Sequence, residues 1–407
     1  MVKTNLNIEG GLRDNSLKVL FVTHNYIRFV GDFAGVFLHL LARGLREQGI
    51  EVFVVAPHDA AVPEYEEIDG IKIYRFRYAA VDRETFAYRG DMHRQLLRNP
   101  FKVFRLRRFI RASFRTASDL IEQEQIPIVS VHWLVPNGLV GKKLKKKFGD
   151  RIRLFLSSHG TDVRLLTGIP LMLPYFRTVI SESDCWTVVS NFLKEQVMTK
   201  DRAVGTKIRV MPMPNDESIF YPDKNVQKDH HLVVATSRLT IQKRLHYLVE
   251  AIKIVSAEIP EIGLEIYGVG PEKMKLVRLI EERGLTGRVS LKKPLPQNRL
   301  REVYNRAAVV VLNSIGEGFG LGLTEAMLCR TAVIGTDSGG IRDIIDDNDT
   351  GLLVPPDDPE RLALAIEKVL TDQSVRNRLA EAGHQKAQFS FTSGSAARAY
   401  ADLFREQ

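Results

Sequence analysis

The sequence predicts an α/β protein of two Rossmann-like domains, whose parallel sheets face each other across a central cleft. Three observations support this. The chain has 407 residues, more than one hydrophobic core usually serves, because single cores stop growing near about 250–300 residues. Short apolar segments alternate with helical patterns, an order typical of parallel sheets. The alternation restarts after a proline-rich segment that begins at Met211.

The N-terminal domain is expected to span residues 1–211. Its first strand, 17–23, is followed by Gly31 and Gly35 and then by a segment whose apolar residues have helical spacing. Helical patterns separate most of the later strands. These strands are expected at 51–56, 71–76, 126–131, 153–157, 185–189 and 207–211.

Residues 212–222 form the predicted linker, because proline continues neither a helix nor a strand. The C-terminal domain is expected over 223–390. Its strands are expected at 232–236, 264–268, 289–292, 308–313 and 332–335. Ligands of open α/β sheets bind at the carboxyl ends of strands, so the active site is expected in the cleft between the two sheets.

The composition argues against several classes of protein. Cys185 and Cys329 are the only cysteines, and neither belongs to a Cys-x-x-Cys or Cys/His pattern, so no disulfide framework or zinc site is expected. The first ten residues are polar, and no run of about 18 apolar residues occurs. We therefore expect a cytoplasmic protein without a membrane span.

The net charge of +9 is concentrated in two places, a lysine run at 142–147 and a stretch from Tyr88 to Arg115 in which Asp91 is the single acid. The bases of that stretch are Arg89, Arg94, Arg98, Lys102, Arg105, Arg107, Arg108, Arg111 and Arg115. Interleaved aromatic residues favour contact with an anionic membrane surface or an acidic acceptor. A solvated helix face that packs its apolar side into its own domain explains the pattern equally well. No nucleic-acid motif accompanies the charge, so nucleic acid is not an expected partner.

The segment from Glu317 to Ala326 carries the strongest functional signal. It places Glu317 and Glu325 around a glycine loop that opens a helix near Leu321. Glycines let backbone N–H groups approach an anion, and the positive end of the helix points to the same place. A diphosphate is therefore expected against Gly318, Phe319, Gly320 and Leu321. Glu325 is placed to accept hydrogen bonds from ribose hydroxyls, although a solvated helix carboxylate is the simpler explanation of that residue alone.

This segment resembles the signature E-G-F-G-x-x-x-x-E-A of the family-4 retaining glycosyltransferases of GT-B fold. The resemblance extends from Val19 to about Phe391. It implies transfer of a sugar from a nucleoside diphosphate to an acceptor hydroxyl, with retention at the anomeric carbon and without a metal or other cofactor. It also implies that Glu317 orients the sugar hydroxyls and that the last helix, within 391–407, packs back on the first domain.

Two further motifs support the resemblance. The segment 237–243 matches the pattern G-R-L-x-x-x-K-G, in which Arg238 and Lys243 would stabilise the leaving diphosphate. His159 lies in Ser-Ser-His-Gly-Thr-Asp at 157–162, which resembles the H-G-x-D element that the family directs at the transferred sugar and the acceptor. Asp162 is either an acceptor-side residue or a helix N-cap.

Weaker signals and departures accompany these motifs. Gly31 and Gly35 lie where related enzymes close a glycine loop under donor or acceptor. Arg244 and Arg330 replace the usual glycines, and Asp343 replaces the glutamate of G-x-P-E. The Asp-Asn-Asp of 347–349 is formally a metal signature, but its polar turn setting argues against a metal site.

We therefore expect a metal-independent hexosyltransferase of surface polysaccharide or glycolipid biosynthesis. Its partners would be a nucleotide-sugar donor and a carbohydrate or lipid-linked acceptor, with possible attachment to the inner membrane face. A nucleotide-sugar epimerase of the same fold is one alternative, although it would need no acceptor and usually lacks the E-G-F-G loop. A catalytically silent sugar-nucleotide-binding or membrane scaffold protein is another, and the departures from the pattern are its only support.

Overall fold

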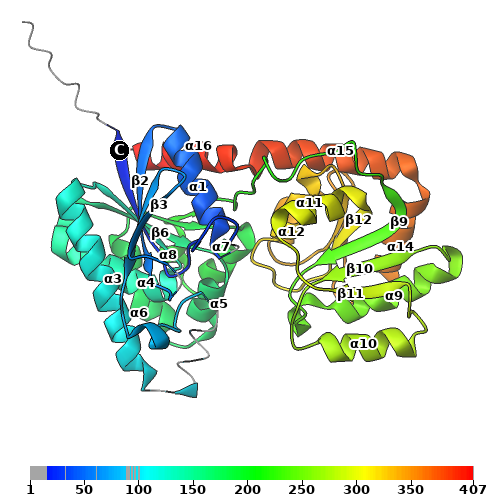
Figure 1. Cartoon of the computed structure of the whole chain (residues 1–407), viewed down its shortest axis with the longest axis horizontal. Helices are drawn as coiled ribbons and strands as arrows, with labels where there is room; N and C mark the ends of the chain where they lie inside the picture. The colour runs from blue at the N-terminus through cyan, green and yellow to red at the C-terminus, as the bar shows by residue number, and fades with distance from the viewer. Residues whose placement is uncertain are drawn as a thin grey trace, which may run out of the picture.

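The computed structural model describes residues 16–406 except 33, 61, 89–91, 93–94, 96–97 and 100. Two lobes lie side by side, each built around its own sheet (Figure 1). The polar first ten residues and three members of the predicted basic stretch, Arg89, Asp91 and Arg94, lie outside the described residues.

The first sheet has eight strands in the order β3-β4-β2-β1-β5-β6-β7-β8. The strands are β1 (Leu17–Val22), β2 (Ile50–Pro57), β3 (Tyr65–Ile68), β4 (Ile71–Phe76), β5 (Ile128–His132), β6 (Arg153–Ser158), β7 (Cys185–Val188) and β8 (Ile208–Val210). Every strand predicted for this region is present. Only β3, which was not predicted, runs antiparallel to its neighbour.

The second sheet has six parallel strands in the order β11-β10-β9-β12-β13-β14. The strands are β9 (Asp229–Thr236), β10 (Gly263–Tyr267), β11 (Val289–Lys292), β12 (Ala307–Leu312), β13 (Ala332–Thr336) and β14 (Leu352–Val354). The short edge strand β14 was not predicted, and all the predicted strands of this region are present.

Helices cover both faces of the first sheet. They are α1 (Val36–Glu47), α3 (Lys102–Glu124), α4 (Leu134–Phe148), α5 (Thr161–Gly168), α6 (Met172–Glu182), α7 (Asn191–Met198) and α8 (Arg202–Gly205), with short 3₁₀ turns at Val81–Arg83 and Gly149–Arg151. Strand side chains alternate between the faces. Leu20 and Val22 of β1 therefore pack into the core formed with α3, α4 and α6, whereas Val19 and Phe21 pack into the core formed with α1 and the C-terminal helix.

The second lobe is built in the same way. Its helices are α9 (Leu245–Glu258), α10 (Lys273–Glu282), α11 (Gln297–Arg306), α12 (Leu321–Leu328), α13 (Ile341–Ile344), α14 (Pro359–Thr371) and α15 (Gln373–Ser390), with a 3₁₀ turn at Ile241–Lys243. Within the described ranges, no helix is long and apolar enough to span a membrane.

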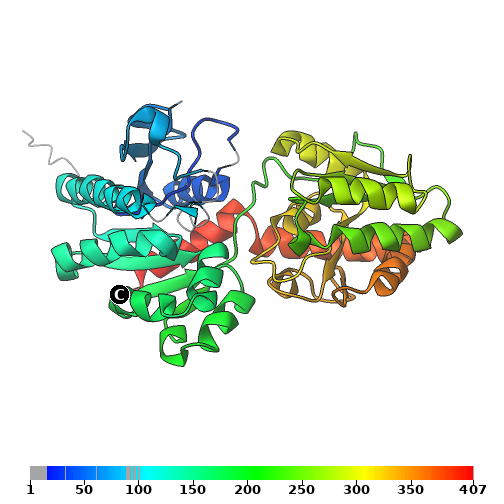
Figure 2. The same cartoon turned by 90° about the horizontal axis from the view of Figure 1, so that it is seen from below.

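The last helix, α16 (Ser393–Arg405), leaves the second lobe and packs on α1 of the first (Figure 1). Gly44 of α1 allows the close contact, because a Cβ atom there would lie 2.6 Å from the Cβ of Ala397. Figure 2, in which the molecule is seen from below, shows this helix passing between the two lobes on the far side. The chain also passes from the first lobe to the second near Asn215. This segment runs beside the start of α16, since the Asn215 N–H donates to the Phe391 carbonyl at 2.8 Å.

Each sheet has a point where successive connections leave in opposite directions. This point lies between β1 and β5 in the first sheet and between β9 and β12 in the second. Crevices for ligands form at such points, at the carboxyl ends of the strands. Both lobes therefore offer a binding crevice, and the cavities described below lie at these two points.

Candidate active site

A cavity of about 360 Å³ lies between the lobes. Residues that follow β9 and β12 form one wall, and residues that follow β6 form the other. The lining residues predicted from the sequence are His159, Arg238, Lys243, Glu317, Gly318, Phe319, Gly320 and Leu321. One cavity thus brings together most of the predicted site, from segments far apart in the chain.

The glycine loop has the geometry that the sequence predicts. Helix α12 begins at Leu321, and Gly320 before it has φ 125°, a value that favours glycine. Gly318 meets the other lobe, because a Cβ atom there would lie 3.4 Å from both the Gly160 Cα and the His159 carbonyl oxygen. The N-terminal end of α12 therefore points its free N–H groups at a cavity closed from the opposite side by β6 and α5.

Lys243 and Glu317 form an ion pair on the cavity wall, while Arg238 is exposed at its edge. The Ser314 hydroxyl donates to the same carboxylate at 3.0 Å. Burial alone would raise the pKa of Glu317. The charge and hydrogen bond of Lys243, the hydrogen bond from Ser314 and the charge of Arg164 outweigh that effect and lower this pKa. Glu317 is therefore a carboxylate at neutral pH.

Glu325 lies one helical turn behind the cavity wall and is not among the lining residues. The Tyr304 hydroxyl donates to its carboxyl group at 2.9 Å and lies 2.8 Å from the Thr236 hydroxyl, which does line the cavity. Burial raises the pKa of Glu325 to about 7, although the Tyr304 hydrogen bond opposes this. The group is therefore poised to titrate near neutral pH, unlike Glu317.

His159 stands on the N-terminal side, in contact with other rings. Its ring centroid lies 4.6 Å from Trp133 and 4.8 Å from Phe37, and its Nε2 lies 3.3 Å from Nδ1 of His132. Burial, with smaller contributions from His132 and His24, lowers the pKa of His159 well below its ordinary value. The imidazole is therefore neutral, and its buried Nδ1 has no hydrogen-bond partner among the described residues.

Asp162 supports the backbone around His159. The carboxylate is buried and accepts from the N–H groups of Leu134 at 2.9 Å and of His159 and Gly160 at 3.2 Å. All three donors are backbone N–H groups that follow β5 or β6, so Asp162 holds the ends of these two strands together. Burial raises its pKa despite these bonds.

Gly31 and Gly35 line neither this cavity nor the second cavity described below. Gly31 is exposed. Gly35, with φ 68°, precedes α1, and a Cβ atom there would lie 2.5 Å from the Asn25 carbonyl oxygen. An acceptor-side role for the two glycines stays a prediction.

Arg164, Gln242 and Tyr304 are among the site residues that were not predicted. Arg164 of α5 and Gln242 line the cavity and join across it, since an Arg164 Nη1 donates to the Gln242 amide oxygen at 3.1 Å. The sequence motifs could have indicated these two residues, because Arg164 closely follows His159 and Gln242 immediately precedes Lys243. Tyr304 comes from α11, and no local pattern links it to Glu325.

The structure shows the backbone geometry or the contacts of each residue that departs from the motif. Arg244 and Arg330 have φ 49° and 54°, in the left-handed region that glycine occupies without strain. Asp343 accepts from the backbone N–H and side-chain amide of Asn191, at 2.5 and 3.2 Å, across the cleft. It therefore joins the lobes, and it is not among the residues that line the cavity.

The Asp-Asn-Asp of 347–349 lies in a turn, where the Asp347 carboxylate accepts from the Leu353 N–H at 2.8 Å. Among the residues that the structure describes, no group of three or more His, Cys, Asp or Glu side chains is arranged to hold a metal ion.

Two family models match successive parts of the chain. Glycosyltransferase Family 4 matches residues 34–218, and Glycosyl transferases group 1 matches residues 217–386. The chain belongs to the family-4 glycosyltransferases. This glycosyltransferase is accordingly an enzyme that uses a nucleotide-sugar donor.

Curated relatives and solved structures agree with this assignment. N-acetyl-alpha-D-glucosaminyl L-malate synthase of Bacillus anthracis is 24% identical over 75% of this chain and 81% of its own. TuaC of Bacillus subtilis, whose name assigns it to teichuronic acid biosynthesis, is 24% identical over 94% of this chain and 97% of its own. Sucrose-phosphate synthase of Thermosynechococcus elongatus superposes with a TM-score of 0.76 at 22% identity, over 96% of this chain and 98% of that chain, and so shows the GT-B fold.

Proposed function

We propose that this glycosyltransferase moves a hexose from a nucleoside diphosphate to a hydroxyl of a carbohydrate or lipid-linked acceptor, in surface polysaccharide or glycolipid synthesis. The cavity between the lobes is the observation that carries the proposal. Its lining combines three cations, a helix N-terminus and a neutral histidine from the opposite lobe. The name of TuaC supports the polysaccharide setting.

The diphosphate would bind at the N-terminal end of α12. Backbone N–H groups from Gly318 to Leu321 and the side chains of Arg238 and Lys243 would neutralise the charge that develops as the diphosphate leaves. Such charge stabilisation would make a metal ion unnecessary. Glu325, one helical turn behind the cavity wall, would accept the ribose hydroxyls, and Tyr304 already donates to it.

The transferred sugar would lie between Glu317 and His159. Without a donor, Lys243 pairs with Glu317. A bound diphosphate would draw the ammonium group toward its own charge and leave the Glu317 carboxylate to accept from sugar hydroxyls. The acceptor oxygen would attack the anomeric carbon on the face that the diphosphate leaves, and its proton would pass to the leaving phosphate oxygen. The configuration is thereby retained.

Closure of the lobes would keep water away from this step. Gly318 already approaches Gly160 closely, and the Arg164–Gln242 bond spans the cavity. A closed cleft limits hydrolysis of the donor, since only the acceptor hydroxyl then reaches the anomeric carbon.

We also propose that one face of the first lobe contacts anionic membrane lipids. Helix α3 exposes Phe104, Arg107, Arg108, Arg111 and Arg115 along one side, and the adjacent α4 exposes Lys142, Lys143, Lys146 and Lys147. Most apolar residues of α3, such as Phe109 and Ile110, pack into the core, whereas Phe101 and Phe104 are 80% and 60% exposed. Bases beside exposed aromatic rings suit a lipid surface.

Nucleotide release from UDP-, GDP- and ADP-sugars, with and without crude membrane extract, tests the transferase proposal. One donor should release nucleotide, extract should increase the rate, and Lys243→Ala and Glu325→Ala should each lower it about 100-fold or more. An epimerase would instead convert its donor without any effect of the extract. A silent binding protein would bind nucleotide and release none from its sugars.

Vesicle sedimentation tests the membrane proposal. Joint replacement of Arg105, Arg107, Arg108 and Arg111 by glutamine should abolish binding to vesicles of phosphatidylglycerol and phosphatidylcholine, because each base near the surface contributes about 1 kcal/mol. Unchanged binding by this variant would show that the face has no such role.

A further inference from the structure

A second cavity, of about 380 Å³, lies in the first lobe at the switch point between β1 and β5. His24 follows β1, Trp133 follows β5, and Thr161 opens the helix after β6; all three line it. Thr161 also lines the cavity between the lobes. The two cavities therefore adjoin where the anomeric carbon of the donor would lie, and the second one is placed to receive the acceptor.

Most of the residues that line this cavity are apolar or aromatic. The apolar residues are Phe86, Met92, Leu106, Val135, Pro136, Leu139, Leu165, Met172 and Phe176. The described lining includes neither lysine nor arginine, and its one acid, Asp162, is occupied by backbone donors. A small anionic acceptor would therefore meet no cationic side chain among these described lining residues, whereas an apolar group would lose its contact with water.

Polar groups occur at the inner end, beside the donor cavity. The Asn137 amide lies 3.0 Å from Nδ1 of His24, which leaves His24 Nε2–H as a donor. The Asn25 side-chain oxygen is buried and has no partner among the described residues. Burial lowers the pKa of His24 to about 4, so the ring is neutral. This end suits an alcohol, which both donates and accepts hydrogen bonds.

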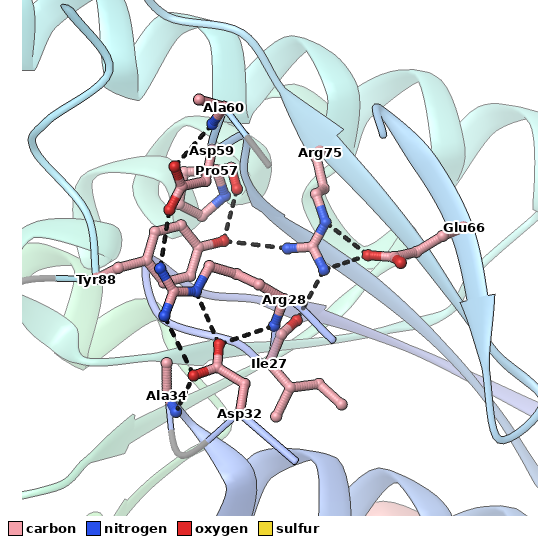
Figure 3. Close-up of polar contacts among 10 residues, drawn as sticks. All are labelled: Ile27, Arg28, Asp32, Ala34, Pro57, Asp59, Ala60, Glu66, Arg75 and Tyr88. Carbon is pink, nitrogen blue, oxygen red and sulfur yellow. Dashed lines mark hydrogen bonds and ion pairs between the residues drawn. The ribbon is translucent and has the colours of Figure 1, made fainter. Parts of the chain in front are cut away.

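A polar network holds the shape of the cavity (Figure 3). The hydroxyl of Tyr88, a lining residue, donates to the Pro57 carbonyl at 2.6 Å and accepts from Arg75 at 3.1 Å. The Arg28 guanidinium lies over the Tyr88 ring at 5.0 Å and bonds Asp32 at 2.7 Å. Three loops after β1, β2 and β4 are thus fixed around one aromatic wall.

Exposed apolar side chains lie on or next to helices α3 and α6, which contribute residues to the cavity wall. Leu106 and Tyr175, from the first turns of α3 and α6, both line it. Tyr175 is 62% exposed, and Leu171 and Phe104 beside these residues in the chain are also exposed. An apolar chain could therefore extend from the cavity toward the face that we assign to lipid.

We propose that the acceptor is an amphiphilic alcohol whose apolar part fills this second cavity, next to the hydroxyl that receives the sugar. The proposal rests on the proposed transferase function and deepens it. In such an acceptor the apolar chain begins at the reacting hydroxyl or one sugar ring away from it. The proposal thereby excludes a polar acceptor such as a dicarboxylic acid or a long oligosaccharide.

Calorimetric titration with a series of alkyl β-glucosides, from methyl to octyl and below their micelle-forming concentrations, tests this proposal. Affinity should rise about fourfold for each CH₂ buried until the cavity is full. Equal affinities along the series would overturn it. Methyl glucoside or malate binding as tightly as the longer alkyl glucosides would also overturn it.

Two variants locate the binding. Leu139→Trp fills the cavity and should remove the dependence on chain length, and Leu106→Trp provides the same test from α3 if the first variant does not fold. Leu364→Trp, at an exposed leucine of α14 in the other lobe, is the matched control and should behave as the native protein. Unchanged octyl glucoside binding by both cavity variants would place the detergent elsewhere and refute the proposal.

The transferase proposal and the acceptor-site proposal can be refuted independently of each other. Nucleotide binding to the donor cavity should be unaffected by Leu139→Trp. If no nucleotide sugar is turned over while the chain-length dependence persists, the transferase proposal is wrong and the apolar site stands. If a donor is turned over but alkyl glucosides bind no better than methyl glucoside, the apolar acceptor site is wrong and the transferase stands.

Discussion

Arg330, immediately after α12, combines strain with a weak compensating contact. Its φ of 54° is one that glycine adopts freely, and its guanidinium pairs with Glu381 at the surface. A left-handed residue with a Cβ costs about 1–2 kcal/mol, while exposed ion pairs contribute about 0–1 kcal/mol. The departure from the family glycine is therefore a local cost to stability and carries no information against catalysis.

Arg330→Gly should raise the free energy of unfolding by about 0.5–1 kcal/mol, since the relief of strain exceeds the greater chain entropy of glycine. Urea denaturation checks this. Arg330→Ala is the control, because it removes the ion pair and keeps the strain, and it should be no more stable than the native protein. A lower stability for the glycine variant would contradict the explanation.

Glu325 makes the stability of the fold depend on pH. Its folded pKa of about 7 lies above the ordinary 4.5, so its contribution to stability is fully present below pH 4.5 and is lost as pH rises through 7. The loss is about 3 kcal/mol in total. The neighbouring Tyr304 and Cys329 stay neutral over this range, because burial raises both pKa values.

If ribose hydroxyls bind the ionised carboxylate, donor affinity should rise about tenfold per pH unit below 7 and level off above it. Calorimetric titration with the nucleotide sugar between pH 5.5 and 8 measures this. Glu325→Gln should bind more weakly and show no such slope. A pH-independent affinity in the native protein would remove Glu325 from the ribose site.

At the scale of elements, the loops after β1, β2 and β4 depend on one buried cation. The Arg75 side chain is fully buried, pairs with Glu66 and donates to the Ile27 carbonyl at 2.7 Å and to Tyr88 (Figure 3). Removal of one partner from a buried pair leaves the other charge and several acceptors unsatisfied.

Arg75→Met should therefore lower the free energy of unfolding of the first lobe by about 3–5 kcal/mol. Thermal unfolding followed by calorimetry measures the loss. Arg83→Met is the control, because Arg83 and its ion-pair partner Asp82 are both exposed, and the expected change is under about 1 kcal/mol. Equal losses for the two variants would show that the network is not what fixes these loops.

The elements that sequence predicts well are those whose pattern is local. The buried strands, the start of α12 at Leu321 and the motifs around Glu317 and Arg238 are of this kind. Strands β3 and β14 escaped prediction because they are short edge strands, of four and three residues, with little pattern of their own. The second cavity and the link from Tyr304 to Glu325 escaped because both depend on contacts between distant segments.

At the scale of the whole molecule, polar contacts join the two lobes across the cleft. Asp343 of the second lobe accepts from the first turn of α7 in the first lobe, and Arg164 bonds Gln242. We expect these few bonds to favour the closed state while still allowing the lobes to separate. The linker at 212–222 stays a prediction. Separation of the lobes would be consistent with a hinge in that linker.

Asp343→Ala should shift the donor-free protein toward an open form, by about fivefold for the loss of about 1 kcal/mol. The radius of gyration from small-angle scattering should increase, and a bound donor should restore the native value. Asp337→Ala removes an ion pair within the second lobe and is the matched control. If Asp343→Ala leaves the radius of gyration at the native value, these bonds do not hold the cleft.

The central claim is that Glu317 acts on the sugar while other groups hold the nucleotide. The measurement that tests it most directly compares Glu317→Gln with the native enzyme, with nucleotide binding and turnover of the same donor measured in parallel. We expect nucleotide affinity to change less than about threefold and turnover to fall about 100-fold or more. Native turnover in this variant, or loss of nucleotide binding together with turnover, would contradict the account.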